Sequence, residues 1–337
     1  MENVTIRMLA ERLQLSTATI SKALSNSHEI SEETKQRVLA LARELNYVPN
    51  PYASSLRKKA SHTIAVVIPE VADSFFAEAI NGIESVAQEK GYHVLIYLTH
   101  ENSGKERGIL KDFQSGRVDG VLISVTTETA SAPHGLDQLV KEIPIVFFDR
   151  VCEDVIAAKI TTDDAAAAYK ATSHLVAGGC RQIGLLAASP HLSISNRRAE
   201  GFLQALAAHG LPQNKAAVTY CSNDHATTKQ LLKKIFREQQ YDGIIATTEK
   251  LATAVYEVCE EMNLRIPQDL QVIGFSNLST ARFLNPSLTT ISQPAFDMGK
   301  AAATLLFKAL KNNSFALSEQ QQVIPSALIV RKSTIAT

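Results

Sequence analysis

The sequence has no net charge and few cysteines, and each shortage excludes a class of protein. Lys plus Arg and Asp plus Glu number 34 each, which argues against a histone-like protein, because coating a polyanion requires a large positive surplus. The four cysteines form no CxxC pair and are far apart: Cys152, Cys180, Cys221 and Cys259. They support neither a disulfide framework nor a zinc site, so we expect reduced thiols and no metal or other cofactor.

Long hydrophobic runs are also absent. No apolar stretch approaches the roughly 18 residues that a membrane helix needs, and Met1–Thr5 does not begin a basic-then-apolar leader. Hydrophobic residues make up 45% and charged residues 20% of the chain, which is an ordinary globular composition. We therefore expect a cytoplasmic protein that contacts no membrane.

The length and the distribution of charge indicate a small domain joined to a larger part. The 337 residues suggest two domains and leave room for a third, small one. Residues 1–60 carry nine Lys or Arg against six Asp or Glu, a surplus of three, whereas the rest carries 25 against 28. A basic head on a mildly acidic body fits a nucleic-acid-binding module attached to something else.

The first sixty residues predict three short helices. Thr5, Ser16 and Ser31 are each placed to cap a helix. The apolar residues that follow recur at helical spacing, and Pro49 and Pro51 stop the third helix. The short connection between the first two helices indicates a helix-turn-helix, in which the second helix enters a DNA groove. A generic three-helix domain is the alternative.

Several motifs in this region resemble the headpiece of the lactose/galactose repressor family. They are VTIRMLA at 4–10, LSTATISKAL at 15–24, ISEET at 30–34 and ELNYVPN at 44–50. The resemblance implies an all-α DNA-binding headpiece and a periplasmic-binding-protein-like body. It also implies a homodimer that binds near-palindromic operator DNA under the control of a small-molecule effector.

The resemblance assigns base-reading roles to Thr17, Ala18 and Lys22. Lys22 stands where an arginine is usual, and lysine donates to guanine as a flexible point charge rather than a rigid fork. Residues 48–60 resemble a hinge helix, in which Leu56 would wedge into the minor groove. The alternatives are a solvated Lys22 and a Leu56 that only packs within a linker. The predicted DNA-contact set is Thr5, Ser16, Thr17, Ala18, Ser21, Lys22, Asn50, Ala53 and Leu56.

After residue 60, apolar runs alternate with helical stretches, which predicts parallel sheets covered on both faces. The expected strands are 63–69, 92–98, 120–125, 143–149, 182–188, 216–220, 243–246, 270–275, 288–291 and 323–330. They form two Rossmann-like halves, and ligands in such folds bind beyond the carboxyl ends of the strands. The resemblance adds three crossings between the two lobes. The expected domains are 1–47, the hinge 48–60, an N-terminal lobe of 61–161 plus 292–323, and a C-terminal lobe of 162–291 plus 324–337.

The predicted ligand-contact set is Phe75, Phe76, Asp149, Arg150, Arg198, Thr248 and Ser276. The two phenylalanines follow the first strand, where they stack on a ligand or join the core of the next helix. Arg198 matches the family's effector-binding arginine, the alternative being a surface arginine. Relatives often carry an aspartate where this chain has Ser276. With that acceptor missing beside Arg150, Arg197 and Arg198, we expect a positive pocket and a sugar or acidic sugar derivative.

Enzyme motifs are missing from the sequence. It contains no GxxxxGK[ST], GxGxxG after a strand, HExxH or GxSxG. The two remaining alternatives are a small-molecule-binding protein without a regulatory role and an enzyme on the same fold. Residues 326–334 show no heptad pattern, which favours a dimer over a coiled-coil-tethered tetramer. We predict a transcription regulator, most simply a repressor, and no enzyme.

Overall fold

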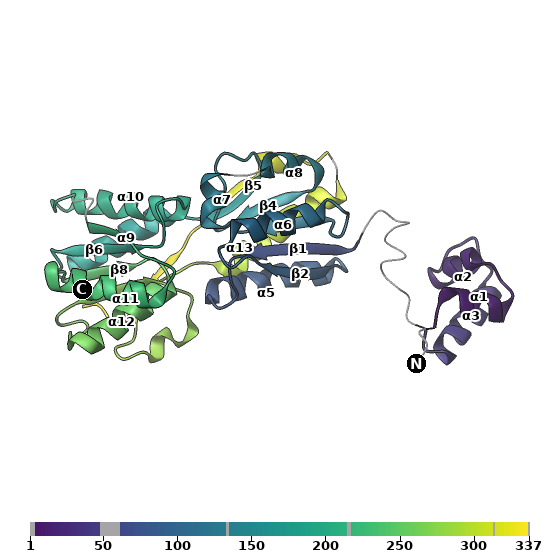
Figure 1. The fold of residues 1–337 in the computed structure, drawn as a ribbon, viewed down its shortest axis with the longest axis horizontal. Coiled ribbons are helices and arrows are strands. Elements are labelled where there is room, and N and C mark those ends of the chain that lie inside the picture. The colour runs from purple at the N-terminus through teal and green to yellow at the C-terminus, as the bar shows by residue number, and fades with distance from the viewer. Residues whose placement is uncertain (1–3, 48–60, 133–134, 214–216, 313, 336–337) are drawn as a thin grey trace. The chain divides into compact units, whose positions relative to one another are not determined.

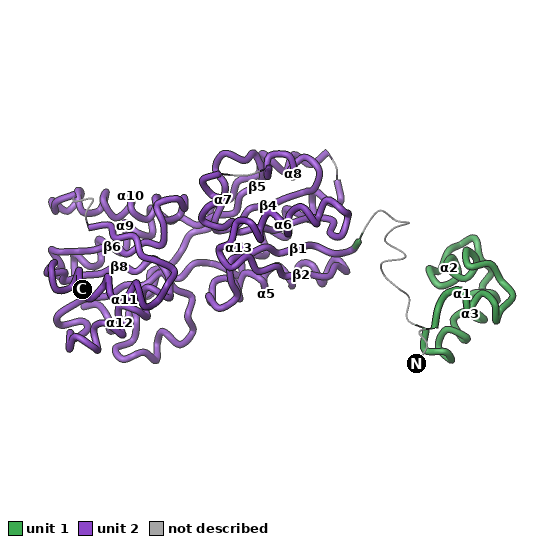
Figure 2. Tube along the Cα trace, viewed as in Figure 1, with its two compact units in different colours: residues 1–61 green, residues 62–337 purple. Residues whose placement is uncertain are grey.

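The computed structural model describes residues 4–47, 61–132, 135–213, 217–312 and 314–335. The chain divides into two compact units (Figure 1, Figure 2). We call residues 1–61 the headpiece and residues 62–337 the body. Each unit has hydrophobic clusters of its own. Within the described ranges, no helix is long and apolar enough to cross a membrane.

The described headpiece contains three helices, as the sequence predicts: α1 (Ile6–Leu13), α2 (Thr17–Leu24) and α3 (Glu32–Glu44). The predicted caps are confirmed. The hydroxyl oxygens of Thr5, Ser16 and Ser31 each accept a hydrogen bond from the backbone N–H three residues on, at 3.4, 3.0 and 3.3 Å. These bonds satisfy donors that the first turn of a helix leaves free. One cluster of buried side chains holds the helices together: Leu9, Ala10, Ile20, Ala23, Val38 and Ala42.

The N-terminal lobe of the body is built on a six-stranded sheet with the order β11-β5-β4-β3-β1-β2. All of its pairings are parallel. The strands are β1 (Thr63–Ile68), β2 (His93–Leu98), β3 (Gly120–Ile123), β4 (Ile145–Phe148), β5 (Ala158–Thr162) and β11 (Gln321–Ile324).

Helices cover both faces of this sheet (Figure 1). They are α5 (Ser74–Glu89), α6 (Ser103–Phe113), α7 (Thr127–Ser131), α8 (Leu136–Glu142) and α13 (Ala295–Lys311). Successive side chains of a strand point to opposite faces of the sheet. Val66 therefore belongs to the hydrophobic cluster beneath α5 and α13, whereas Val67 belongs to the cluster beneath α6 and α8. Burial on both faces explains why the central strands read as continuous apolar runs.

The C-terminal lobe repeats this plan with the order β12-β10-β9-β8-β6-β7. Its strands are β6 (Ile183–Ala187), β7 (Val218–Tyr220), β8 (Gly243–Ala246), β9 (Gln271–Phe275), β10 (Thr289–Ser292) and β12 (Ala327–Ile329). Its helices are α9 (Asp164–Ala177), α10 (Ser193–Ala208), α11 (His225–Glu238) and α12 (Glu249–Met262). Strand β12 pairs antiparallel with β10, and the other pairings are parallel. Short 3-10 turns cover Ser279–Phe283 and Leu317–Glu319.

The chain passes between the lobes after β5, after β10 and after β11. The single strand expected over 323–330 was wrong, because β11 ends at Ile324 and β12 begins at Ala327 in the other sheet. Pro325 lies between them and has no N–H to donate to a strand partner. The N–H and hydroxyl of Ser326 both donate to Asp163 at 2.7 Å. This contact ties two of the crossing segments together.

Two helix pairs approach so closely that only glycine fits between their backbones. A Cβ on Gly201 of α10 would lie 1.9 Å from the carbonyl oxygen of Ala165 in α9. A Cβ on Gly299 of α13 would lie 2.0 Å from the carbonyl oxygen of Ala79 in α5. The missing side chains therefore set how closely each helix pair packs within its lobe.

Candidate ligand cleft and nucleic-acid interface

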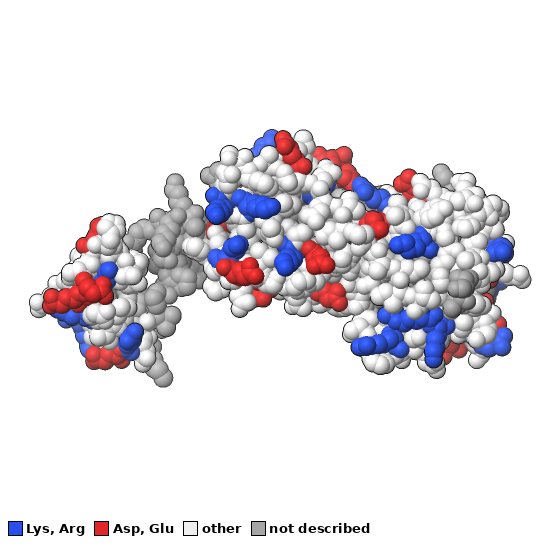
Figure 3. Space-filling model, turned by 180° about the vertical axis from the view of Figure 1, so that it is seen from behind, with Lys and Arg blue, Asp and Glu red and all other residues white. Residues whose placement is uncertain are grey.

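The outer face of α2 is the candidate nucleic-acid interface. Thr17, Ala18 and Lys22 are exposed, whereas Ser21 is half-buried. The Lys22 ammonium pairs with the Glu29 carboxylate within the headpiece. In the view of Figure 3 the headpiece shows both basic and acidic side chains, so the side that is visible there is not uniformly positive. A helix that enters DNA here would exchange the Glu29 partner for groups of the nucleic acid.

The remaining predicted DNA contacts lie elsewhere. Thr5 and Ser16 are exposed, and their hydroxyl oxygens already serve as helix caps. Asn50, Ala53 and Leu56 lie outside the described residues.

The candidate ligand site lies between the two lobes, beyond the carboxyl ends of the central strands. All seven residues predicted for ligand contact line one small inner pocket of about 30 Å³. Asp149 follows β4, Thr248 follows β8 and Ser276 follows β9. Since the fold brings strand ends of both lobes to one place, residues as far apart in sequence as Phe75 and Ser276 meet there.

Phe75 and Phe76 join the core of α5, which was one of the two expected roles, and they also line the inner pocket. Their relative exposures are 5% and 3%. Their rings meet edge to face with centroids 5.4 Å apart, and Phe76 meets Phe148 in the same manner at 6.4 Å. The pair forms an apolar wall whose position is fixed by the core.

Arg198 is buried at the base of the inner pocket and is not a surface arginine. Its Nε donates to Asp164 Oδ1 and its Nη1 to the carbonyl of Thr247, both at 2.7 Å. The guanidinium lies 4.2 Å from the centroid of the Phe275 ring. Among the described residues, neither Nη2 nor Asp164 Oδ2 has a hydrogen-bond partner. A buried donor and acceptor left unpaired are costly, so this corner suits a ligand rich in hydroxyl groups.

The other arginines of the site are also paired with carboxylates. Arg150 forms an ion pair with Glu101, and its Nε lies 4.0 Å from Asp149 Oδ2. Arg197 pairs with Glu153 of the opposite lobe at 2.8 Å. The expectation of a positive pocket was therefore wrong, because each arginine has an acidic neighbour that is distant in sequence.

Two aspartates of the cleft titrate far above their ordinary value of 3.8. Burial raises the pKa of Asp149 to about 6. Burial also raises the pKa of Asp73 to about 6, and the negative charge of Glu249 adds to this effect. A carboxyl group that exchanges its proton near neutral pH can both donate and accept hydrogen bonds.

The Glu249 carboxylate binds groups of both lobes next to Ser276. Its carboxylate accepts hydrogen bonds from the Ser276 hydroxyl at 2.9 Å and from the N–H of Asn277 at 3.0 Å. It also accepts from the N–H of Ser74 at 3.2 Å and from the Ser74 hydroxyl, across the cleft. Since Ser74 and Glu249 each begin a helix, the carboxylate lies where two helix dipoles favour negative charge.

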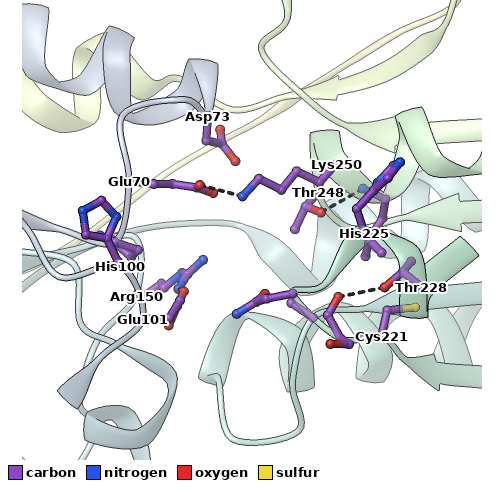
Figure 4. A pocket seen from close by; sticks show the side chains of 15 residues that line it. Glu70, Asp73, His100, Glu101, Arg150, Cys221, His225, Thr228, Thr248 and Lys250 are labelled. Carbon is purple, nitrogen blue, oxygen red and sulfur yellow. Dashed lines mark hydrogen bonds and ion pairs between the residues drawn. The ribbon is translucent and has the colours of Figure 1, made fainter. Parts of the chain in front are cut away.

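A second pocket of about 230 Å³, called the outer pocket here, lies next to the inner one, and Figure 4 shows the side chains that line it. The two pockets share Asp73, Arg150 and Thr248. At the outer pocket, Lys250 reaches across to Glu70 at 2.5 Å. The cleft as a whole therefore offers paired donors and acceptors from both lobes.

Sequence reasoning missed several residues of the cleft: Asp73, Asp164, Thr247, Asn277 and Gln293. The pattern of Asp73 before an apolar run is a helix-cap signal, and this side chain does cap α5 at 3.0 Å. Gln293 gives no comparable signal, because it belongs to a crossing segment. It is buried, and its Nε2 lacks a partner in the part of the chain that the structure describes.

Comparison with known proteins gives consistent results for both units. Residues 5–50 match the model of bacterial regulatory proteins of the lacI family, and residues 172–334 match that of a periplasmic binding protein-like domain. A ribose operon repressor from Halalkalibacterium halodurans is 32% identical over 98% of this chain and 97% of its own. The lac repressor dimer bound to operator and an anti-inducer is similar in fold, with a TM-score of 0.85 at 22% identity, over 99% of this chain and 100% of that one.

A lacI-family regulator from Enterococcus faecium with bound ribose is likewise similar in fold. Its TM-score is 0.72 at 24% identity, over 81% of this chain and 98% of that one.

Proposed function

The chain belongs to the lacI family of bacterial regulatory proteins and is a DNA-binding transcription regulator; we propose that it is a repressor whose operator affinity is set by a neutral sugar bound between the lobes. The carrying observation is the inner pocket, which is lined by a phenylalanine wall and by Arg198 and Gln293, each with a buried nitrogen that has no hydrogen-bond partner among the described residues. Sugars present apolar ring faces and hydroxyl edges that complement such a site.

The charges of the cleft support a neutral effector rather than an acidic one. Arg150 and Arg198 are occupied by carboxylates, and Asp73, Asp149 and Glu249 add negative charge beside them. A carboxylate or phosphate placed here would be repelled, whereas hydroxyl groups can donate to the acidic oxygens. The ribose operon repressor among the relatives is consistent with a neutral sugar.

On the DNA side, Thr17, Ala18 and Lys22 of α2 would read base edges, with Leu56 as the minor-groove wedge. A symmetric dimer would present two such helices to the half-sites of a near-palindromic operator. We place this dimer in the cytoplasm and assign it no catalytic activity of its own. Effector binding changes operator affinity because the sugar favours one arrangement of the lobes, and a coupling of about 1–3 kcal/mol changes that affinity roughly 5- to 150-fold.

The test measures binding of the purified full chain to DNA fragments from upstream of its own gene and its neighbours. We expect one fragment to bind much more tightly than random duplex, and one neutral sugar to change that affinity in either direction. Equal affinity for all fragments, with and without every sugar tried, would contradict the proposal. Steady turnover of a sugar in the absence of DNA would instead favour the enzyme alternative.

A further inference from the structure

The N-terminal lobe has a pocket of its own between helices α6 and α8, which we call the α6–α8 pocket. Its volume is about 280 Å³, close to the lower end of the range of about 300–1,000 Å³ that is typical of small-molecule sites. Among the described residues, none lines both this pocket and a pocket of the cleft. The proposed function makes no use of it, and its size suits a ligand of a few atoms beyond a single charged group.

Part of the lining of the α6–α8 pocket is apolar. Leu110 of α6 and both Leu136 and Leu139 of α8 line it, and all three are buried in the hydrophobic cluster beneath these helices. Because the core holds the three leucines in place, they offer a preformed apolar surface to a ligand.

A buried carboxylate with one unpaired oxygen also lines the pocket. Glu106 of α6 is 0% exposed, and its Oε2 accepts a hydrogen bond from the N–H of Thr126 at 2.9 Å. Its Oε1 is buried and has no hydrogen-bond partner among the described residues. Burial raises the pKa of Glu106, which reflects the cost of an uncompensated buried charge. A ligand group with a positive charge and N–H donors would offset this cost.

Two exposed basic side chains of α6, Arg107 and Lys111, line the same pocket. Their spacing of four residues makes them neighbours on the helix surface. Neither takes part in an ion pair in the part of the chain that the structure describes. In this respect they differ from the arginines of the cleft, and they are available to an anionic group of a ligand.

These three features together select the class of ligand. A phosphate would bring its charge beside the buried carboxylate of Glu106 and would give that oxygen no donor. A neutral sugar would place hydroxyl groups against the leucines and would leave Arg107 and Lys111 without a counter-charge. An α-amino acid carries an ammonium group, a carboxylate and a side chain on one carbon atom, and each of these has a complement in the lining.

We propose that the α6–α8 pocket is a second small-molecule site, which binds a free α-amino acid with an apolar side chain. The ammonium group donates to Glu106, the carboxylate lies beside Arg107 and Lys111, and the side chain packs on the leucines. Such a site lets the protein sense an amino acid independently of the ligand in the cleft.

The experiment is isothermal titration of the full chain with valine, leucine, isoleucine, methionine and phenylalanine, each as the free L-amino acid. We expect at least one of them to bind. Its N-acetyl derivative lacks the ammonium group and its amide lacks the carboxylate, so each derivative should bind at least about tenfold more weakly. Glycine, which has no side chain to pack on the leucines, should bind at least about tenfold more weakly as well.

Two variants test whether the amino acid occupies this pocket. Glu106→Gln keeps an oxygen for the N–H of Thr126 but removes the negative charge, and it should weaken binding at least about tenfold. Arg107→Ala changes an exposed side chain and should weaken binding about twofold to fivefold. Lys105→Ala is the matched control, because it removes an exposed cation of the same helix that does not line the pocket.

Each outcome supports or contradicts the site without reference to the operator. If none of the five amino acids binds, the site is wrong. If one binds but Glu106→Gln and Arg107→Ala bind it as tightly as Lys105→Ala does, the amino acid lies elsewhere and the assignment is wrong. If the N-acetyl derivative or the amide binds as tightly as the free amino acid, recognition of both charged groups is wrong. The proposed regulation by a sugar stands in all of these cases.

Discussion

The headpiece and the body place their functional side chains differently with respect to their cores. In the headpiece, the core is formed by residues such as Leu9 and Ile20, whereas Thr17 and Lys22 lie on the outside of α2. In the body, Arg198 is 3% exposed and is itself part of the interior. Function and stability should therefore separate readily in the headpiece and be coupled in the cleft.

The strongest test of this coupling is Arg198→Ala, which leaves Asp164 as an unpaired buried carboxylate. We expect a loss of about 3–5 kcal/mol in the free energy of unfolding of the body together with loss of the effector response. Urea unfolding and titration with the effector measure the two effects.

A double variant keeps this prediction informative if Arg198→Ala does not fold. Arg198→Met combined with Asp164→Asn removes both charges, which for buried pairs is often neutral or stabilising. We expect restored stability and operator binding without an effector response. A double variant that still responds normally would remove Arg198 from the site.

Gly201→Ala is expected to lower stability through the packing of α9 against α10. The added Cβ would meet the backbone of Ala165 at 1.9 Å, so α9 and α10 must move apart, at a cost of about 3 kcal/mol. Gly108→Ala is the matched control, because its Cβ meets nothing within 4 Å in helix α6, and alanine favours a helix by about 1 kcal/mol. Thermal unfolding should show opposite shifts, and a Gly201→Ala protein as stable as Gly108→Ala would contradict the close packing.

The headpiece and the cleft also differ in how much of each can be predicted from the sequence alone. The headpiece caps at Thr5, Ser16 and Ser31 depend on residues within one helical turn, so local patterns predict them. The seven cleft residues follow from strand ends and family resemblance. The charge balance of the cleft does not follow from the sequence, because Asp164 neutralises the charge of Arg198 and Glu101 neutralises that of Arg150. These pairs are 34 and 49 residues apart in sequence, and only the folded lobes bring them together.

A third test uses pH to examine a buried cleft residue. The pKa of Asp149 is about 6 in the fold against about 4 in an unfolded chain. The native state therefore holds more protons between these values, and stability falls as pH rises from about 4 to 6 and stays low above. About two pKa units correspond to at most about 3 kcal/mol.

Asp149→Asn should therefore be more stable than the unmodified protein at pH 7.5 and lose that advantage toward pH 4.5. Urea unfolding at several pH values measures the difference, and Asp154→Asn, at an exposed position, controls for the loss of one charge. An advantage of equal size at both pH values would show that ionisation of Asp149 does not limit the stability of the cleft.

The smallest expected effect tests whether headpiece function separates from stability. Lys22→Ala should cost about 1–3 kcal/mol of operator affinity at one base position and relax the preference there, while the unfolding free energy changes by less than about 0.5 kcal/mol. Glu29→Gln removes the ion-pair partner of Lys22. We expect this variant to have the opposite effect and to strengthen DNA binding. Binding to operators substituted at each position measures both. Equal weakening on all sequences would make Lys22 a phosphate contact, and a large loss of stability would mean that headpiece function, like that of the cleft, depends on its fold.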